Sequence, residues 1–192
     1  MEAPLAKELS PRAINLVALA WGLAEGTFFF FVPDVWLTWV ALGTPRLAAV
    51  ACLWAVAGAV AGGTLMYCWG RVDPATVLAA LDAVPAISRA MCEQVGEQIR
   101  TGGVATMAVG TFSGVPYKIY AAQAGVNAVN LFAFLAMSVL ARLSRFLLVT
   151  GIAAALFRFT PQWTTTRRRW VHVALWSLFY IGYFWVFRDP VD

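Results

Sequence analysis

The sequence has 192 residues, of which 61% are hydrophobic and 12% are charged. A typical soluble domain is about half apolar and about a quarter charged, so a soluble fold could not remove this much apolar surface from water. The net charge of +4 does not point to nucleic acid, because the basic residues are scattered singly except for one cluster at 167–169. The composition therefore predicts an all-α integral membrane protein with a single membrane domain, residues 1–192.

The first long apolar segment, residues 13–42, is interrupted by Glu25-Gly26 and by Pro33-Asp34. One helix of this length would extend about 45 Å at about 1.5 Å per residue, whereas the hydrocarbon core of a bilayer is about 30 Å thick. A single straight span is therefore not expected. The segment instead predicts a broken helical hairpin that enters the membrane and returns to the same side, with Gly26 and Pro33 at its turn.

The next apolar segment, residues 47–69, has the length of one transmembrane helix. Gly58 and Gly62 give it a small-residue surface that lets another helix approach closely. Residues 13–70 together form the first predicted repeat. The following stretch, 74–100, is more polar and has apolar residues at helical spacing beside charged ones, which predicts an amphipathic helix lying in the membrane interface.

The second predicted repeat, residues 102–159, has a similar order. It begins with an apolar segment broken at Gly114 and Pro116 and continues as a long helical run from residue 128. Residues 168–188 then predict a C-terminal transmembrane helix rich in Trp and Tyr. Paired interruptions at corresponding places are typical of inverted-repeat transporters, so the sequence predicts two re-entrant hairpins as inverted repeats, each followed by a transmembrane helix.

The basic residues divide unequally between the two membrane faces if each hairpin returns to its own side. The richer face holds Lys7, Arg12, Arg46, Arg158 and the cluster at 167–169, and the other face holds Arg71, Arg89, Arg100 and Arg188. The positive-inside rule predicts that the richer face is cytoplasmic.

Ionisable residues inside the hydrophobic segments are the candidate functional residues: Glu25, Asp34, Lys118, Arg142 and Arg145. Each costs at least about 2.5 kcal/mol at the bilayer centre, so each is expected to be paired or hydrated. We predict that Glu25 and Asp34 form a proton or cation site. Lys118, Arg142 and Arg145 are predicted to bind a phosphate group of the substrate. The alternative is that all of them form structural ion pairs that close the hairpins.

Enzymatic interpretations are less well supported. Ser113 and Lys118 could form a Ser-Lys dyad, but a serine beside Gly114 is expected to stabilise the turn. His172 is the only histidine and is predicted to lie at the membrane interface. The sequence has no phosphate-binding glycine loop and no Cys or His pair at metal-ligand spacing, so we predict no enzymatic activity, no cofactor and no metal site.

Short motifs at wide spacing carry a family resemblance. They are Glu25-Gly26 with Pro33-Asp34, Gly62-Gly63 with Tyr67 and Gly70-Arg71, Val115-Pro116-Tyr117-Lys118 with Gly125, and Arg142 with Arg145-Phe146. Together they cover about residues 20–158 and resemble the DedA or VTT-domain (SNARE-associated Golgi protein-like) membrane proteins, most of all the YqaA-like branch.

The resemblance implies two oppositely inserted re-entrant hairpins and movement of lipids, including undecaprenyl phosphate and phospholipids, between leaflets, with proton coupling. By position, Glu25 matches the membrane-embedded acid of the first hairpin, Asp34 lies near its second acid, and Lys118 falls where many members have an arginine. The sequence departs from the family at Thr64, where an Asp is common, and at Thr111, roughly where the first of two hairpin arginines would be.

The residues and the resemblance together predict a transporter, above all a lipid flippase or scramblase that moves a phospholipid or polyprenyl phosphate between leaflets. One alternative is a proton-coupled exchanger of small ions or drugs that uses the same acids. Another is a membrane assembly factor that transports nothing and tolerates neutral substitutions at every buried charge. The expected partners are membrane lipids and protons, with a homodimer left open, and the expected location is the bacterial inner (plasma) membrane.

Overall fold

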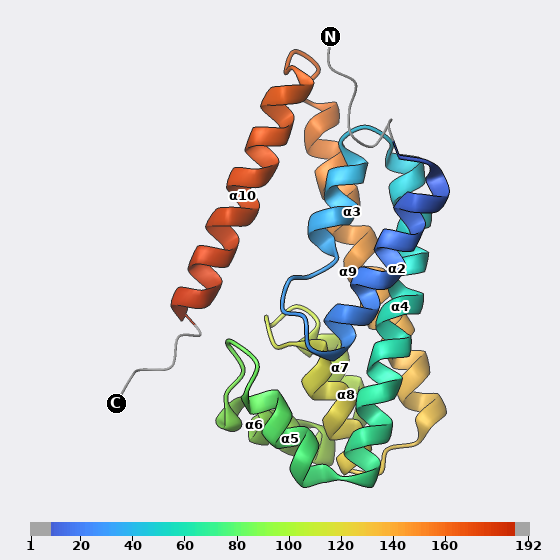
Figure 1. The fold of residues 1–192 in the computed structure, drawn as a ribbon, viewed down its shortest axis with the longest axis vertical. Coiled ribbons are helices and arrows are strands. Elements are labelled where there is room, and N and C mark those ends of the chain that lie inside the picture. The colour runs from blue at the N-terminus through green and yellow to red at the C-terminus, as the bar shows by residue number, and fades with distance from the viewer. Residues whose placement is uncertain (1–8, 187–192) are drawn as a thin grey trace.

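The computed structural model describes residues 9–186, and within them every regular element is a helix, which confirms the predicted all-α class. Lys7 and Arg188, and the last two residues of the predicted span 168–188, lie outside the described residues. Figure 1 shows a bundle that is elongated along one axis, with the last helix, α10 (Thr165–Val186), standing apart from the others.

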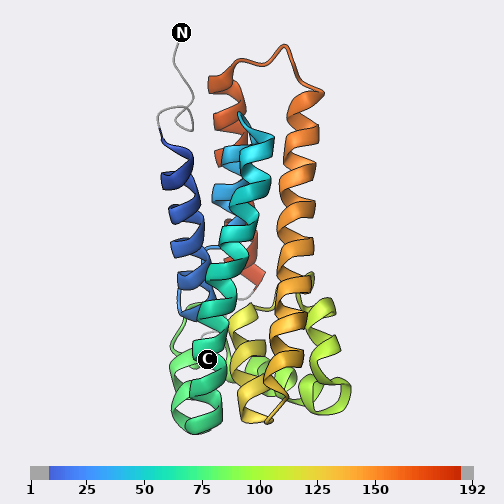
Figure 2. The same cartoon turned by 90° about the vertical axis from the view of Figure 1, so that its right-hand side faces the viewer.

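Two helices in the described part of the chain are long and apolar enough to cross a membrane: α4 (Pro45–Val72) and α9 (Leu131–Arg158). They lie side by side along the bundle (Figure 2) and correspond to the two long spans expected from the sequence. The upper end of the bundle in Figure 1 holds the start of α4 and the end of α9, and the lower end holds the end of α4 and the start of α9.

The first apolar segment is broken into α2 (Pro11–Thr27) and α3 (Asp34–Ala41). The connection, residues 28–33, lies near the middle of the bundle, and α3 runs back towards the upper end where α2 began (Figure 1). Pro33 ends this connection and precedes the first residue of α3. Gly26 was expected at the turn, but it lies in the last turn of α2.

Close contact between α2 and α4 explains the position of Gly26. A Cβ atom at Gly26 would lie 2.8 Å from the carbonyl oxygen of Ala59, and a Cβ at Gly62 would lie 2.6 Å from the carbonyl oxygen of Leu23. Both distances are below van der Waals contact, so only glycine allows the two backbones to approach this closely. The small-residue surface predicted for the first span therefore holds α2.

The stretch 74–100 was predicted as one amphipathic helix, but it forms two, α5 (Pro74–Asp82) and α6 (Arg89–Gly102). The turn between them contains Pro85 and places Ala86 at a φ of 62°, in the left-handed region that ends a helix. The Ser88 hydroxyl then accepts the N–H of Met91 and begins α6. The buried residues of α6 pack against α8 (Tyr117–Val126), and its charged residues are exposed.

The second broken segment occupies the lower half of the bundle (Figure 2). A 3-10 turn, Gly103–Ala105, leads into the short helix α7 (Thr106–Gly110), and residues 111–116 connect α7 to α8. Gly114 has a φ of 83°, which favours glycine, and Pro116 precedes the first residue of α8. This connection lies near the middle of the bundle, where it approaches residues 28–33 of the first hairpin.

Candidate functional site

The two connections bring the five buried ionisable residues to one region at the middle of the bundle. Glu25 lies in the last turn of α2, and Asp34 is the first residue of α3. Lys118 lies in the first turn of α8, and Arg142 and Arg145 share one face of α9. Four of these side chains are almost fully buried, and the Arg145 side chain is 20% exposed. Segments that are more than 100 residues apart in sequence therefore build this site.

The first ion pair joins α2 to α9. Arg142 donates Nη2–H to Oε2 of Glu25, and both side chains are buried. The guanidinium also lies over the rings of Tyr117 and Phe146, with its carbon 4.8 Å and 4.9 Å from their centroids. Tyr117 in turn donates its hydroxyl to Ser138 at 3.0 Å. The ion pair and the two rings hold the Arg142 guanidinium, as expected for a buried charge, although its Nε–H has no acceptor among the described residues.

The second ion pair closes the other end of the first connection. Arg145 donates Nη2–H to Oδ2 of Asp34 at 3.1 Å. Asp34 is the first residue of α3, where the partial positive charge of the helix N-terminus also favours a carboxylate. The other carboxylate oxygen, Oδ1, is buried and has no hydrogen-bond partner among residues 9–186. A second donor, from a ligand or a water molecule, would satisfy this oxygen.

Lys118 differs from the two arginines because it forms no ion pair within residues 9–186. Its side chain is 1% exposed, and Nζ donates to the carbonyl oxygen of Phe29 at 2.7 Å. The ammonium therefore crosses from the second hairpin to the connection of the first. The site holds three cationic side chains against two carboxylates, and the N-terminus of α8 adds a partial positive charge beside Lys118. This region consequently favours an anion.

A cavity of about 220 Å³ adjoins these charges, and we call it the polar cavity because ionisable side chains form part of its otherwise mainly apolar lining. Glu25, Lys118 and Arg145 line it, whereas Asp34 and Arg142 lie behind its wall. The cavity lies between the two connections, and α10 closes one side with Tyr180 and Tyr183. The predicted site residues thus divide into three that face the cavity and two that hold the others in place.

The aromatic residues of α10 in this wall were not predicted as site residues. Tyr180 and Tyr183 line the cavity. Trp176, one helical turn before Tyr180, shares their face of α10, and this spacing of four and three residues could have identified an inward face. His172 belongs to the same face and is buried, with Nε2 2.9 Å from the Thr38 hydroxyl. Thr38 and Trp39 of α3 contact its ring, and its position at the membrane interface stays a prediction.

The remaining sequence candidates have local roles. Ser113 donates its hydroxyl to the carbonyl oxygen of Gly110, so it stabilises the 111–116 turn. Thr111 lines the cavity and donates its hydroxyl to the carbonyl oxygen of Met107. Within the described residues no three His, Cys, Asp or Glu side chains are grouped in a way that could hold a metal ion.

The fold and this site define an all-helical protein that has two helices apolar enough to span a membrane and a buried, positively biased cluster of charges. The chain is similar to an uncharacterized protein of Haemophilus influenzae, with 30% identity over 135 residues that cover 68% of this chain and 67% of the relative. It belongs to the same family as that protein. No protein-family model and no solved structure matches the chain, so its relation to the DedA proteins stays a prediction.

Proposed function

We propose that the chain is an integral membrane protein, with α4, α9 and α10 as spans and with the two hairpins as inverted re-entrant repeats. Only 28% of the most apolar stretch of α9 is buried, whereas the core helix of a soluble protein would be mostly buried. The exposed surface of α9 and α10 carries many large apolar side chains, among them Leu140, Leu148, Ile152, Leu156, Leu175, Leu178 and Ile181. Exposed apolar side chains in this number are stable in lipid rather than in water.

The proposed activity is movement of a phosphate-bearing lipid between leaflets. The observation that supports it best is the environment of Lys118. A buried ammonium with only a carbonyl acceptor is costly unless an anion reaches it. Lys118 lines a cavity that also contains the partly exposed Arg145. Two cations converging on one cavity fit a phosphate, whose oxygens accept several charge-assisted hydrogen bonds.

The ion pairs suggest how such a site would operate. Glu25 and Asp34 hold the two arginines of α9 against the first hairpin, so they lower the net charge of the empty site. Binding of phosphate to Lys118 and Arg145 would compete with Asp34 for the Arg145 guanidinium. A proton taken up by Asp34 would relieve this competition, which gives a route for proton coupling in an alternating-access cycle.

Leaflet exchange in proteoliposomes tests this proposal. The purified chain is reconstituted with fluorescent phospholipid or polyprenyl-phosphate analogues, and exchange is measured by chemical quenching of the outer leaflet. Lys118→Met removes the ammonium, keeps the apolar stem and leaves no carboxylate unpaired. Arg100→Gln is the control, because Arg100 is exposed and pairs with Glu97 on α6, away from the cavity.

We expect exchange by the wild type and by Arg100→Gln, and loss of exchange in Lys118→Met. If the wild type moves no lipid but takes up small ions in response to a pH gradient, the site belongs to an exchanger instead. If the wild type moves neither lipid nor small ions, and Lys118→Met supports the protein's function in cells as well as the wild type does, the protein is an assembly factor and the transport proposal is wrong.

A further inference from the structure

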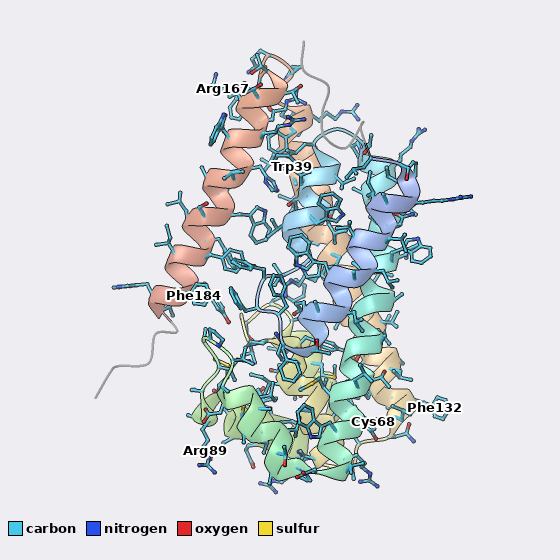
Figure 3. The ribbon with its side chains drawn as sticks, in the orientation of Figure 1. Trp39, Cys68, Arg89, Phe132, Arg167 and Phe184 are labelled. Carbon is cyan, nitrogen blue, oxygen red and sulfur yellow. The ribbon has the colours of Figure 1, made fainter. Side chains whose placement is uncertain are left out.

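A second cavity, larger than the polar one and almost entirely apolar, lies between α10 and the first hairpin. Its volume is about 860 Å³, within the usual range for ligand pockets. Its walls include Trp21, Phe31, Trp36 and Trp39 of the first hairpin and Trp176 and Ile181 of α10. Figure 3 shows Trp39 on the side of α3 that faces α10, with many side chains between the two elements. We call this cavity the α10 groove.

Three of the four indole N–H groups beside the α10 groove have acceptors within the protein. Trp21 donates Nε1–H to the carbonyl oxygen of Phe31 at 2.9 Å, and Trp36 donates to the carbonyl oxygen of Ile14 at 3.2 Å. Trp176 donates to the Thr38 hydroxyl at 3.1 Å. These donors are therefore not available to a ligand, and the rings present apolar surface to the groove. Such a surface favours a hydrocarbon over a polar molecule.

The α10 groove adjoins the polar cavity at Tyr180, which lines both. The Tyr180 hydroxyl accepts the backbone N–H of Val32 at 2.8 Å, and its ring packs against Phe31 with a centroid distance of 4.6 Å. Tyr180 thus joins α10 to the connection that separates the groove from the charges. At the lower end of α10, Phe184 packs on Phe30 of the same connection, with a centroid distance of 5.5 Å (Figure 3).

The length of the groove corresponds to one leaflet of a bilayer. Along α10 it extends from His172 to Ile181, a rise of about 14 Å at about 1.5 Å per residue. Half of a hydrocarbon core is about 15 Å thick. The polar cavity lies at the lower end of the groove, at the middle of the bundle, so the groove covers the half of the bundle that ends in the 167–169 arginine cluster.

We propose that the α10 groove binds one hydrocarbon chain of the lipid whose phosphate is held by Lys118 and Arg145. This inference rests on the proposed function for the phosphate and adds the site of the chain. A lipid bound in this way has its head group at the middle of the membrane and its chain in the leaflet on the arginine-rich side. Tyr180 lies at the junction between head group and chain.

Photolabelling locates the chain without requiring transport. The purified full-length protein is placed in nanodiscs that contain a phospholipid with a diazirine in the middle of one acyl chain. After irradiation, labelled peptides are identified by mass spectrometry. We expect severalfold more label on residues 31–39 and 172–181 than on residues 139–148, which include exposed residues of α9 outside the groove.

Two filling variants and one matched control test the site. Val35→Trp and Ser177→Trp each place an indole in the groove, from α3 and from α10, and the Ser177 side chain is exposed, so the helix itself accommodates the change. Val139→Trp makes the same change as the first on α9, outside both cavities. Label on the groove peptides should fall severalfold in both filling variants and stay unchanged in the control. Equal labelling of the groove and of α9, or labelling that survives both filling variants, would overturn the inference.

The dependence on the head group separates this inference from the transport proposal. Lys118→Met should reduce labelling of the groove by the phospholipid but not by a diacylglycerol with the same diazirine chain. Unlabelled phospholipid should compete with the labelled lipid for the groove. If these results are obtained while leaflet exchange is absent, the binding site stands and transport fails. If exchange occurs but the groove is not labelled, transport stands and the chain lies elsewhere.

Discussion

Removal of one partner from the buried Glu25–Arg142 pair should destabilise the protein far more than removal of both. In Arg142→Met the Glu25 carboxylate stays buried without its cation, a change that costs about 3–5 kcal/mol. For a chain of this size, 1 kcal/mol corresponds to about 2–4 °C in Tm, so the Tm should fall by about 6–20 °C. The contacts of the guanidinium with Tyr117 and Phe146 contribute about 0.5–2 kcal/mol each and are also lost.

A double-mutant cycle measures the pair itself. Glu25→Gln alone leaves Arg142 buried and unpaired, so its Tm should fall as well. Glu25→Gln combined with Arg142→Met removes both charges, and the Tm should recover most of the loss. Unfolding is followed in detergent by circular dichroism. The control Arg100→Met breaks an exposed pair, which is worth at most about 1 kcal/mol. If the two single losses simply add in the double variant, the two residues are not coupled and the described pair is wrong.

Three further predictions test the packing and the topology. Gly58→Val forces a side chain into the backbone of α2 and should lower the Tm by the several degrees expected for about 1–3 kcal/mol of overpacking. Gly151→Val is the control and should leave the Tm unchanged, because a Cβ at Gly151 would have no described atom within 4 Å. Thr38→Val removes the hydroxyl that contacts two α10 side chains, and hydrogen exchange should then increase in residues 170–180 only. Thr164→Cys on a Cys68→Ser background should react with a membrane-impermeant maleimide only from the cytoplasmic side, and labelling of intact cells would contradict the predicted orientation.

Local chemistry explains why the breaks in the apolar segments were predictable. Pro33 and Pro116 precede the first residues of α3 and α8, and Gly114 adopts a backbone conformation that other residues rarely reach. The break of the 74–100 stretch was missed because its apolar spacing continues across Pro85, although proline inside a helical pattern is itself a signal. Gly26 was placed wrongly because a glycine used for close packing has the same sequence signal as one used in a turn.

Tertiary contacts explain what could not be predicted. The sequence shows five charged residues in hydrophobic segments, but not which cation meets which carboxylate, because those pairs join residues more than 100 positions apart. The position of α10 also depends on tertiary contacts, so local sequence patterns could not predict it. Its inward face contacts α3 through His172 and Trp176, and only this placement creates the α10 groove.

The pairing of the charges favours a structural role for Arg142 and a ligand-binding role for Lys118. Arg145 combines both features, because it pairs with Asp34 and also lines the polar cavity. Arg142 and Arg145 reach the end of α2 and the start of α3, the two ends of the first connection, so these arginines and their carboxylates hold that connection to α9. Lys118 comes from the opposite hairpin and contacts a carbonyl oxygen of the first connection. A cation that bridges the two hairpins without a carboxylate can exchange its acceptor for a ligand at little structural cost. Variants of Lys118 should therefore lose activity with little change in Tm, whereas variants of Arg142 should lose both.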